Sequence, residues 1–194
     1  MNELKKLLSE ECVYQLRDDV MERFLSLGEE VRLKPKEILV MSGRVNPHAY
    51  ILKEGILRNT YLEGLKEITV GFALPGTMAL DIHSYYMNQP AFFQIEACCE
   101  SVVLKVTKED FDHLLQESHE FALWALSMTQ CQLYFYEMKK SVINGDAKER
   151  FLSLCRNRPE IVAKVPLGMI ASYLGVTQSY LSRLRKSLFS AKKK

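Results

Sequence analysis

Residues 166–188 read PLGMIASYLGVTQSYLSRLRKSL, a sequence that predicts two short helices crossing at a tight turn. The apolar residues recur at the spacings where crossed helices meet, and Ala171 is small where the two backbones come close. Gly175 suits the turn, because the backbone twist that ends the first helix is costly for a residue with a side chain. Thr177 is placed to cap the second helix. The apolar set comprises Ile170, Leu174, Val176, Leu181 and Leu184.

The residues left on the outer face of the second helix are polar, and several can bond base edges or phosphates. This pattern is typical of a helix-turn-helix, whose second helix enters the major groove of DNA. We expect Gln178 to pair with adenine and Arg183 with guanine. Arg185 and Lys186 are expected to meet phosphates or the surface of their own helix. The predicted DNA-binding residues are Thr177, Gln178, Ser179, Ser182, Arg183, Arg185 and Lys186.

The alternative is a helical hairpin that merely caps a core, and charge separates the two interpretations. From Ile161 to Lys194 there is no Asp or Glu, whereas seven of the 26 lysines and arginines lie there. The rest of the chain is net acidic, because the whole chain carries only +2. A structural hairpin would usually interleave both signs, so this segregation favours binding to a polyanion.

The first 117 residues predict N-terminal helices followed by a β-roll. Apolar and charged residues are mixed at helical spacing up to Gly28. From Val31 to Val106, short apolar runs alternate with turn residues, which indicates strands joined by tight turns. A single sheet of so many strands would expose its edges, so we expect it to close into a small barrel or roll.

Residues 118–143 predict one long helix with a heptad seam. Successive seam residues are alternately three and four positions apart, a spacing typical of a helix that pairs with a second copy of itself. A second stripe, Leu123, Leu126 and Leu133, is expected to face the barrel; burial of both stripes within one chain is the alternative. The predicted dimer interface comprises Phe121, Trp124, Met128, Cys131, Phe135, Met138 and Val142.

Residues able to hold a metal or a cofactor are not gathered anywhere in the sequence. The five cysteines include no CxxC pair, and the four histidines are scattered, so we expect no metal, no cofactor and no enzymatic activity. A cupin-type enzyme would need such a cluster. The N-terminus lacks the apolar run of a signal peptide, and no stretch approaches the ~20 apolar residues of a membrane span. The expected location is the cytoplasm.

The order of these elements resembles the Crp/Fnr family of bacterial transcription regulators over nearly the whole chain. The resemblance implies an α+β fold: a double-stranded, cupin- or cyclic-nucleotide-binding-like β-roll with N-terminal helices (1–117), a dimerisation helix (118–143) and a winged-helix-like helix-turn-helix domain with a truncated wing (144–194). It implies a homodimer on a palindromic site in double-stranded DNA, with RNA polymerase as a further candidate partner. The motifs that carry it are YILKEGILRNTY (50–61), FALPG (72–76), IEACCESVVLKVTKEDF (95–111) and IASYLGVTQSYLSRLRK (170–186).

The chain departs from the family at its ligand cassette and its recognition helix. Family members that bind cyclic nucleotides grip the ribose with a Gly-Glu pair, where this chain has Leu80 and Asp81, and the phosphate with an Arg, where it has Ala91. We therefore expect no response to cyclic AMP. In the recognition helix only Arg183 matches the family pattern, so the operator should differ. The candidate effector pocket comprises Asp81, Tyr85, Tyr86, Phe92 and Phe93.

The aromatic residues of this set leave two interpretations open. They line a pocket for an unidentified apolar or aromatic effector, or they fill the roll, so that the protein has no effector. An alternative function is an effector-binding signalling module that acts through protein or RNA partners.

Overall fold

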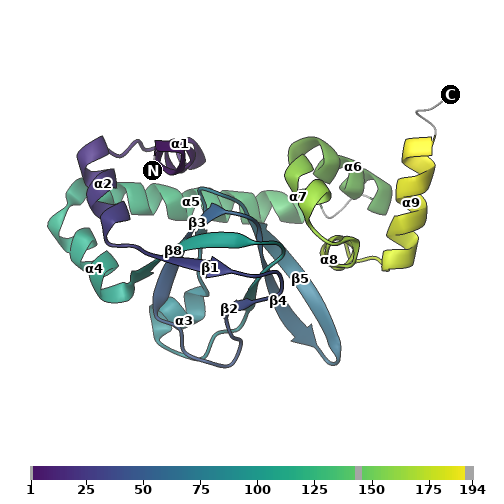
Figure 1. Cartoon of the computed structure of the whole chain (residues 1–194), viewed down its shortest axis with the longest axis horizontal. Helices are drawn as coiled ribbons and strands as arrows, with labels where there is room; N and C mark the ends of the chain where they lie inside the picture. The colour runs from purple at the N-terminus through teal and green to yellow at the C-terminus, as the bar shows by residue number, and fades with distance from the viewer. Residues whose placement is uncertain (1, 143–145, 191–194) are drawn as a thin grey trace.

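The computed structural model describes residues 2–142 and 146–190. Two antiparallel sheets form a roll, along which the long helix α5 (His119–Val142) lies. The N-terminal helices gather at one end of α5 and the C-terminal helices at the other (Figure 1). The α+β roll with a C-terminal helix-turn-helix is the fold that the sequence predicts.

The first sheet has the order β1-β8-β3-β6. Its central strands are β3 (His48–Glu54) and β8 (Ser101–Thr107), and both of their faces bury apolar side chains. Leu52 and Val103 are completely buried inside the roll, and Ile51 is completely buried on the face that the helices cover. A register shift in this pair follows Leu52, so the strands bend there. The outer strands are β1 (Glu29–Leu33) and β6 (Met78–Ala79).

The second sheet has the order β2-β7-β4-β5, so β5 lies at its edge. Strands β4 (Leu57–Glu63) and β5 (Lys66–Ala73) form a long hairpin, and Gly64 in its turn has a φ of +63°. Asn59 pairs with Gly71 and Thr60 with Thr69, so β5 holds one extra residue at this bulge. The other strands are β2 (Ile38–Val40) and β7 (Gln94–Ala97).

Facing residues of the two sheets fill the roll with an apolar core that includes Leu52, Leu57, Ile95 and Val103. A second core lies between α5 and the helices α1 (Asn2–Glu11), α2 (Asp18–Ser26) and α4 (Lys108–Glu117).

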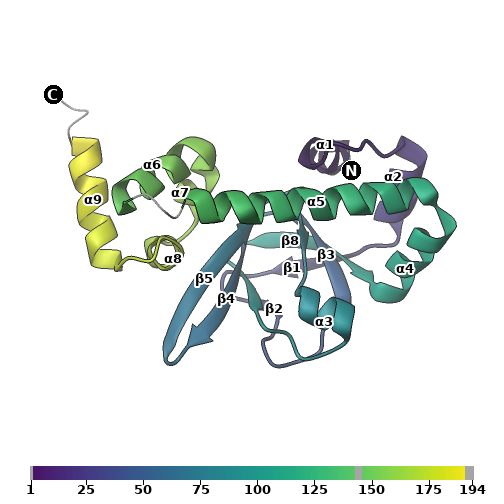
Figure 2. The same ribbon diagram turned by 180° about the vertical axis from the view of Figure 1, so that it is seen from behind.

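The C-terminal part consists of α6 (Ala147–Asn157), α7 (Pro159–Lys164), α8 (Leu167–Tyr173) and α9 (Gln178–Ser190). Phe151 of α6, Ile170 of α8 and Leu181 of α9 are completely or almost completely buried in one cluster. That cluster continues into Ile56, Leu74 and Cys98 of the roll, so these helices share a core with the second sheet. Figure 2 shows them beside the base of the β4–β5 hairpin.

Candidate nucleic-acid interface and roll site

The turn between α8 and α9 has the geometry that the sequence predicts. Gly175 has a φ of +67°, in the left-handed region that favours glycine. The Val176 N–H donates to the Ala171 carbonyl at 3.0 Å, which folds the turn back onto α8. Thr177 Oγ1 accepts a hydrogen bond of 3.2 Å from the Tyr180 N–H and so caps α9. These contacts and the buried Leu181 hold the two helices in a helix-turn-helix.

The predicted DNA-binding residues lie on α9 or at its cap, and all but one of them are exposed. Ser182 is half-buried. The first turn of α9 contains no acidic residue. The N–H groups at the start of the helix and its exposed basic side chains therefore both favour binding of an anion there. The exposed residues are Thr177, Gln178, Ser179, Arg183, Arg185 and Lys186.

Two side chains at the start of α9 add to the sequence prediction. A Cβ atom on Gly168 would lie 2.9 Å from Gln178 Oε1, so the Gln178 amide folds against the start of α8. Tyr180 is 41% exposed and was not among the predicted residues. Its hydroxyl can bond a phosphate oxygen, and its signal in the sequence is an aromatic residue among polar neighbours three positions after the cap.

The roll holds an internal anion where the family cassette would hold a ligand. Asp81, 3% exposed, precedes the short helix α3 (Ile82–Met87) and caps it. Its carboxylate accepts backbone N–H bonds from Ser84 at 2.8 Å, from Phe92 at 3.1 Å and from Phe93 at 2.9 Å. Charge-assisted bonds of this kind are strong. Asp81 therefore ties the start of α3 to the segment that leads into β7.

The aromatic side chains of the predicted effector pocket lie in different surroundings, and the pocket stays a prediction. Tyr85 packs against Phe111 under α4, where burial raises the pKa of its phenol and Lys108 lies 4.7 Å from its ring centroid. Tyr86 is 75% and Phe92 61% exposed. Phe93 contacts Tyr61 instead. The spacing of these residues in the sequence does not reveal which rings turn outward, because the segment passes from a strand into a helix and back into a strand.

The predicted dimer seam on α5 is wrong for three of its residues, because they are buried inside this chain. Phe121, Trp124 and Met128 are at most 1% exposed. Phe24 of α2 contacts both Phe121 and Trp124, with ring centroids 4.9 and 5.3 Å apart. A heptad stripe fits the chain's own helices as well as it fits a partner helix.

The remaining seam residues are not shown to form an interface. Cys131 is half-buried, and its thiol donates to the Glu11 carbonyl at 2.7 Å. The side chains of Phe135, Met138 and Val142 lie outside the described part of the structure.

The stripe expected to face the barrel is the exposed one. Leu126 and Leu133 are 53% and 58% exposed, and Leu123 and Tyr134 beside them are exposed too. Gln130 and Glu137 continue the same three-and-four spacing. The exposed face of α5 is thus an apolar stripe with two polar residues in it, and polar residues within such a stripe are what coiled coils use to set register.

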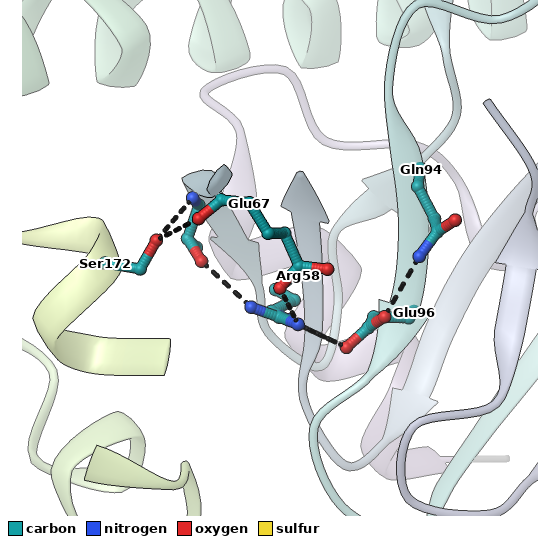
Figure 3. Close-up of polar contacts among 6 residues, drawn as sticks. Arg58, Glu67, Gln94, Glu96 and Ser172 are labelled. Carbon is teal, nitrogen blue, oxygen red and sulfur yellow. Dashed lines mark hydrogen bonds and ion pairs between the residues drawn. The ribbon is translucent and has the colours of Figure 1, made fainter. Parts of the chain in front are cut away.

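An ion network centred on the buried Arg58, which the sequence analysis missed, runs across β7, β4 and β5 and reaches α8 at its β5 end (Figure 3). The Arg58 guanidinium donates to Glu96 at 2.8 Å and to Thr69 Oγ1 at 3.1 Å, and it also pairs with Glu67. Ser172 of α8 contacts the same strand segment. The sequence did not predict this network, because its charged residues lie on three strands and the pairing of those strands was not known.

Within residues 2–142 and 146–190, no group of three His, Cys, Asp or Glu side chains could hold a metal ion. None of the helices that the structure describes is both long and apolar enough to cross a membrane.

Comparison with known proteins identifies the roll. Residues 30–118 match the family model of the cyclic nucleotide-binding domain. No curated protein sequence matches the chain significantly.

Solved structures share the fold over most of the chain. The c-di-GMP-responsive global regulator CLP of Xanthomonas campestris superposes with a TM-score of 0.73 at 17% identity, covering 91% of this chain and 93% of that one. FixK2 of Bradyrhizobium japonicum gives 0.71 at 17% identity, covering 85% and 86%. A CRP-family transcriptional regulator of Thermus thermophilus gives 0.66 at 18% identity, covering 84% and 85%.

Proposed function

Residues 30–118 form a cyclic nucleotide-binding-type domain within a chain that has the fold of the Crp/Fnr transcription regulators, and on this basis we propose a DNA-binding regulator. The protein binds a palindromic site in double-stranded DNA as a homodimer, without catalytic activity. Residues 1–117, 118–143 and 144–194 serve as roll domain, dimerisation helix and DNA-binding domain. RNA polymerase is a proposed further partner.

The observation that carries this proposal is the outer face of α9. It presents Ser179, Arg183 and Lys186 to solvent, while Leu181 is completely buried behind them. No acidic residue follows Glu160 in the sequence, so no carboxylate of this segment opposes approach to phosphate. Arg183 has the two parallel donors that recognise the O6 and N7 atoms of guanine.

Dimerisation through the exposed stripe of α5 follows from what this helix leaves uncovered. Leu126 and Leu133 are large apolar residues on a helix whose opposite face is already packed. A second copy of the stripe would cover them, as at the d positions of a coiled coil. Gln130 between them favours a single register. Two paired chains carry two recognition helices, which is why we propose a palindromic operator.

We propose that the roll does not accept a cyclic nucleotide. A bound phosphate needs a cation or free N–H donors, and the residue at the family's arginine position is the buried Ala91. The nearby backbone donors of Ser84, Phe92 and Phe93 already bind the Asp81 carboxylate, which would repel a phosphate. We therefore propose that cyclic AMP is not the signal, and that the roll is folded and competent without it.

Selection of bound sequences from a randomised duplex library, with no effector added, tests the proposal. Recovery of one palindrome supports a specific dimeric regulator. Sequence-blind, salt-sensitive retention alone would contradict it, as would preferential retention of RNA in a competition between duplex DNA and RNA. A matched selection with cyclic AMP should return the same palindrome at the same affinity.

A further inference from the structure

The surface that supports the helix-turn-helix is an edge strand of the roll. Ser172 of α8 donates from its hydroxyl to the Glu67 carbonyl at 3.0 Å and accepts from the Thr69 N–H at 2.9 Å. Nearby, the rings of Tyr173 and Phe72 lie 5.1 Å apart. Helix α8 is thus docked on β5 through two polar contacts and one aromatic pair.

The side chains of the same two strand residues are held by one guanidinium. Arg58 pairs with Glu67 and donates to Thr69 Oγ1 at 3.1 Å, while its other contact is the buried Glu96 at 2.7–2.8 Å. Gln94 in turn donates to Glu96 at 3.1 Å. The backbone groups that Ser172 contacts therefore belong to residues whose side chains Arg58 fixes (Figure 3).

This support matters because β5 is an edge strand with a bulge at the docking point. An edge strand pairs on one side only, and the extra residue between Thr69 and Gly71 interrupts that pairing. Arg58 is 6% exposed on the neighbouring strand β4, so it anchors the loose segment to the buried Glu96 on β7. A planar guanidinium can hold three partners in this way, whereas an ammonium cannot fix their geometry.

We propose that Arg58 is a positioning residue for DNA recognition, and that it acts through Glu67, Thr69 and Ser172 to fix the orientation of the helix-turn-helix on the roll. Because α8 leads through the tight turn at Gly175 into α9, the same contacts fix the recognition helix. In a dimer they set the distance between the two recognition helices and so the spacing of half-sites that the protein accepts. This inference rests on the proposed DNA-binding function.

The direct test is the variant Ser172→Ala in the full chain. Its affinity is measured for the selected palindrome, for a duplex with a single half-site, and for palindromes with one base pair added or removed at the centre. Loss of two neutral hydrogen bonds should lower affinity for the palindrome by about fivefold to twentyfold. Affinity for the single half-site should stay unchanged, because a loosened domain still reaches one half-site. The penalty for altered spacing should shrink.

Three further variants separate positioning from a general loss of structure. Ser172→Thr keeps the hydroxyl and should restore wild-type behaviour. Ser153→Ala removes a hydroxyl that accepts a hydrogen bond from Asn157 of its own helix, so it should match the wild type. Arg58→Lys keeps the buried charge opposite Glu96 and should reproduce the relaxed spacing preference of Ser172→Ala.

Hydrogen exchange at the Thr69 amide shows whether the contact is broken. The proposal is overturned if Ser172→Ala speeds that exchange but keeps the wild-type preference for palindrome spacing. If the wild type binds no duplex specifically, the proposed function fails instead. In that case, unchanged Thr69 exchange in both Ser172→Ala and Arg58→Lys would overturn the contact itself.

Discussion

The Asp81 carboxylate lies 2.9 Å from the Phe93 backbone nitrogen, and this bond joins the start of α3 to the start of β7. With the bonds from Ser84 and Phe92, one buried side chain holds three N–H groups from two segments. One buried carboxylate therefore holds two segments of the cassette together.

Asp81→Ala should therefore destabilise the roll. It removes a helix cap and two further charge-assisted bonds and leaves buried donors unpaired, so we expect a loss of about 3–5 kcal/mol in the free energy of unfolding. Urea denaturation measures it. Asp146→Ala is the matched control, because Asp146 caps α6 through an exposed bond from the Glu149 N–H, and its loss should cost about 1 kcal/mol. Equal losses in the two variants would contradict the stabilising role of the three N–H bonds to Asp81.

The proposed dimer surface gives a second prediction. Leu126→Lys should convert the dimer to a monomer without loss of secondary structure, because it places like charges face to face across the paired stripes. Sedimentation equilibrium measures the change. Leu62→Lys is the control, since Leu62 is 73% exposed on β4 and should leave the dimer intact. A dimeric Leu126→Lys variant would show that another surface is used.

Phe121→Ala should behave in the opposite way. The ring is completely buried against Phe24 and Trp124, so its removal should lower the free energy of unfolding by about 3–5 kcal/mol. The single tryptophan, Trp124, reports the transition through its fluorescence. A variant that dissociates into stable monomers with unchanged unfolding would restore the original assignment of this seam to the dimer interface.

The sequence predicts the helix-turn-helix well because local rules determine it. The turn at Gly175 and the cap at Thr177 each depend on only a few neighbouring residues, and both have the predicted geometry. The stripes of α5 were assigned to the wrong sides because periodicity gives the faces of a helix but not their partners. Phe121 and Leu126 are equally good seam residues until the positions of α1 and α2 are known.

The Arg58 network could not be predicted for a related reason. Arg58, Glu67 and Glu96 lie on three strands, and only the order β7-β4-β5 brings them together. Sheet register depends on long-range pairing, which the alternation of a single strand does not fix. In the cassette, the departure from the family pattern was visible in the sequence at Asp81 and Ala91, but the hydrogen bonds that the Asp81 carboxylate accepts were not.

Arg183 gives the prediction that tests base recognition. Arg183→Ala should weaken binding to the selected palindrome by about tenfold to a hundredfold per half-site, because a bidentate guanine contact contributes about 1–3 kcal/mol. Binding to random duplex should change little. Lys186→Ala should lower both affinities together and reduce their salt dependence, as expected for a phosphate contact. Parallel losses in both assays for Arg183→Ala would assign it to the backbone instead.

The thiol of Cys98 predicts a loss of stability in alkaline solution. Burial raises the pKa of Cys98 to about 12 from 9.0, against the opposing effect of the Arg58 guanidinium. The folded state therefore keeps a proton that the unfolded chain releases, so the stabilisation is complete below pH 9 and is lost as the pH rises towards 12. One such group changes the free energy of unfolding by at most about 1.4 kcal/mol per pH unit.

Urea denaturation of the wild type and of Cys98→Ala between pH 9 and 11 measures this effect. The slopes of the free energy of unfolding against pH should differ by about this amount, although the variant is less stable at pH 8. Parallel curves would mean that the thiol ionises in the folded protein as readily as in the unfolded chain, and that this part of the contact between roll and helix-turn-helix is open to water.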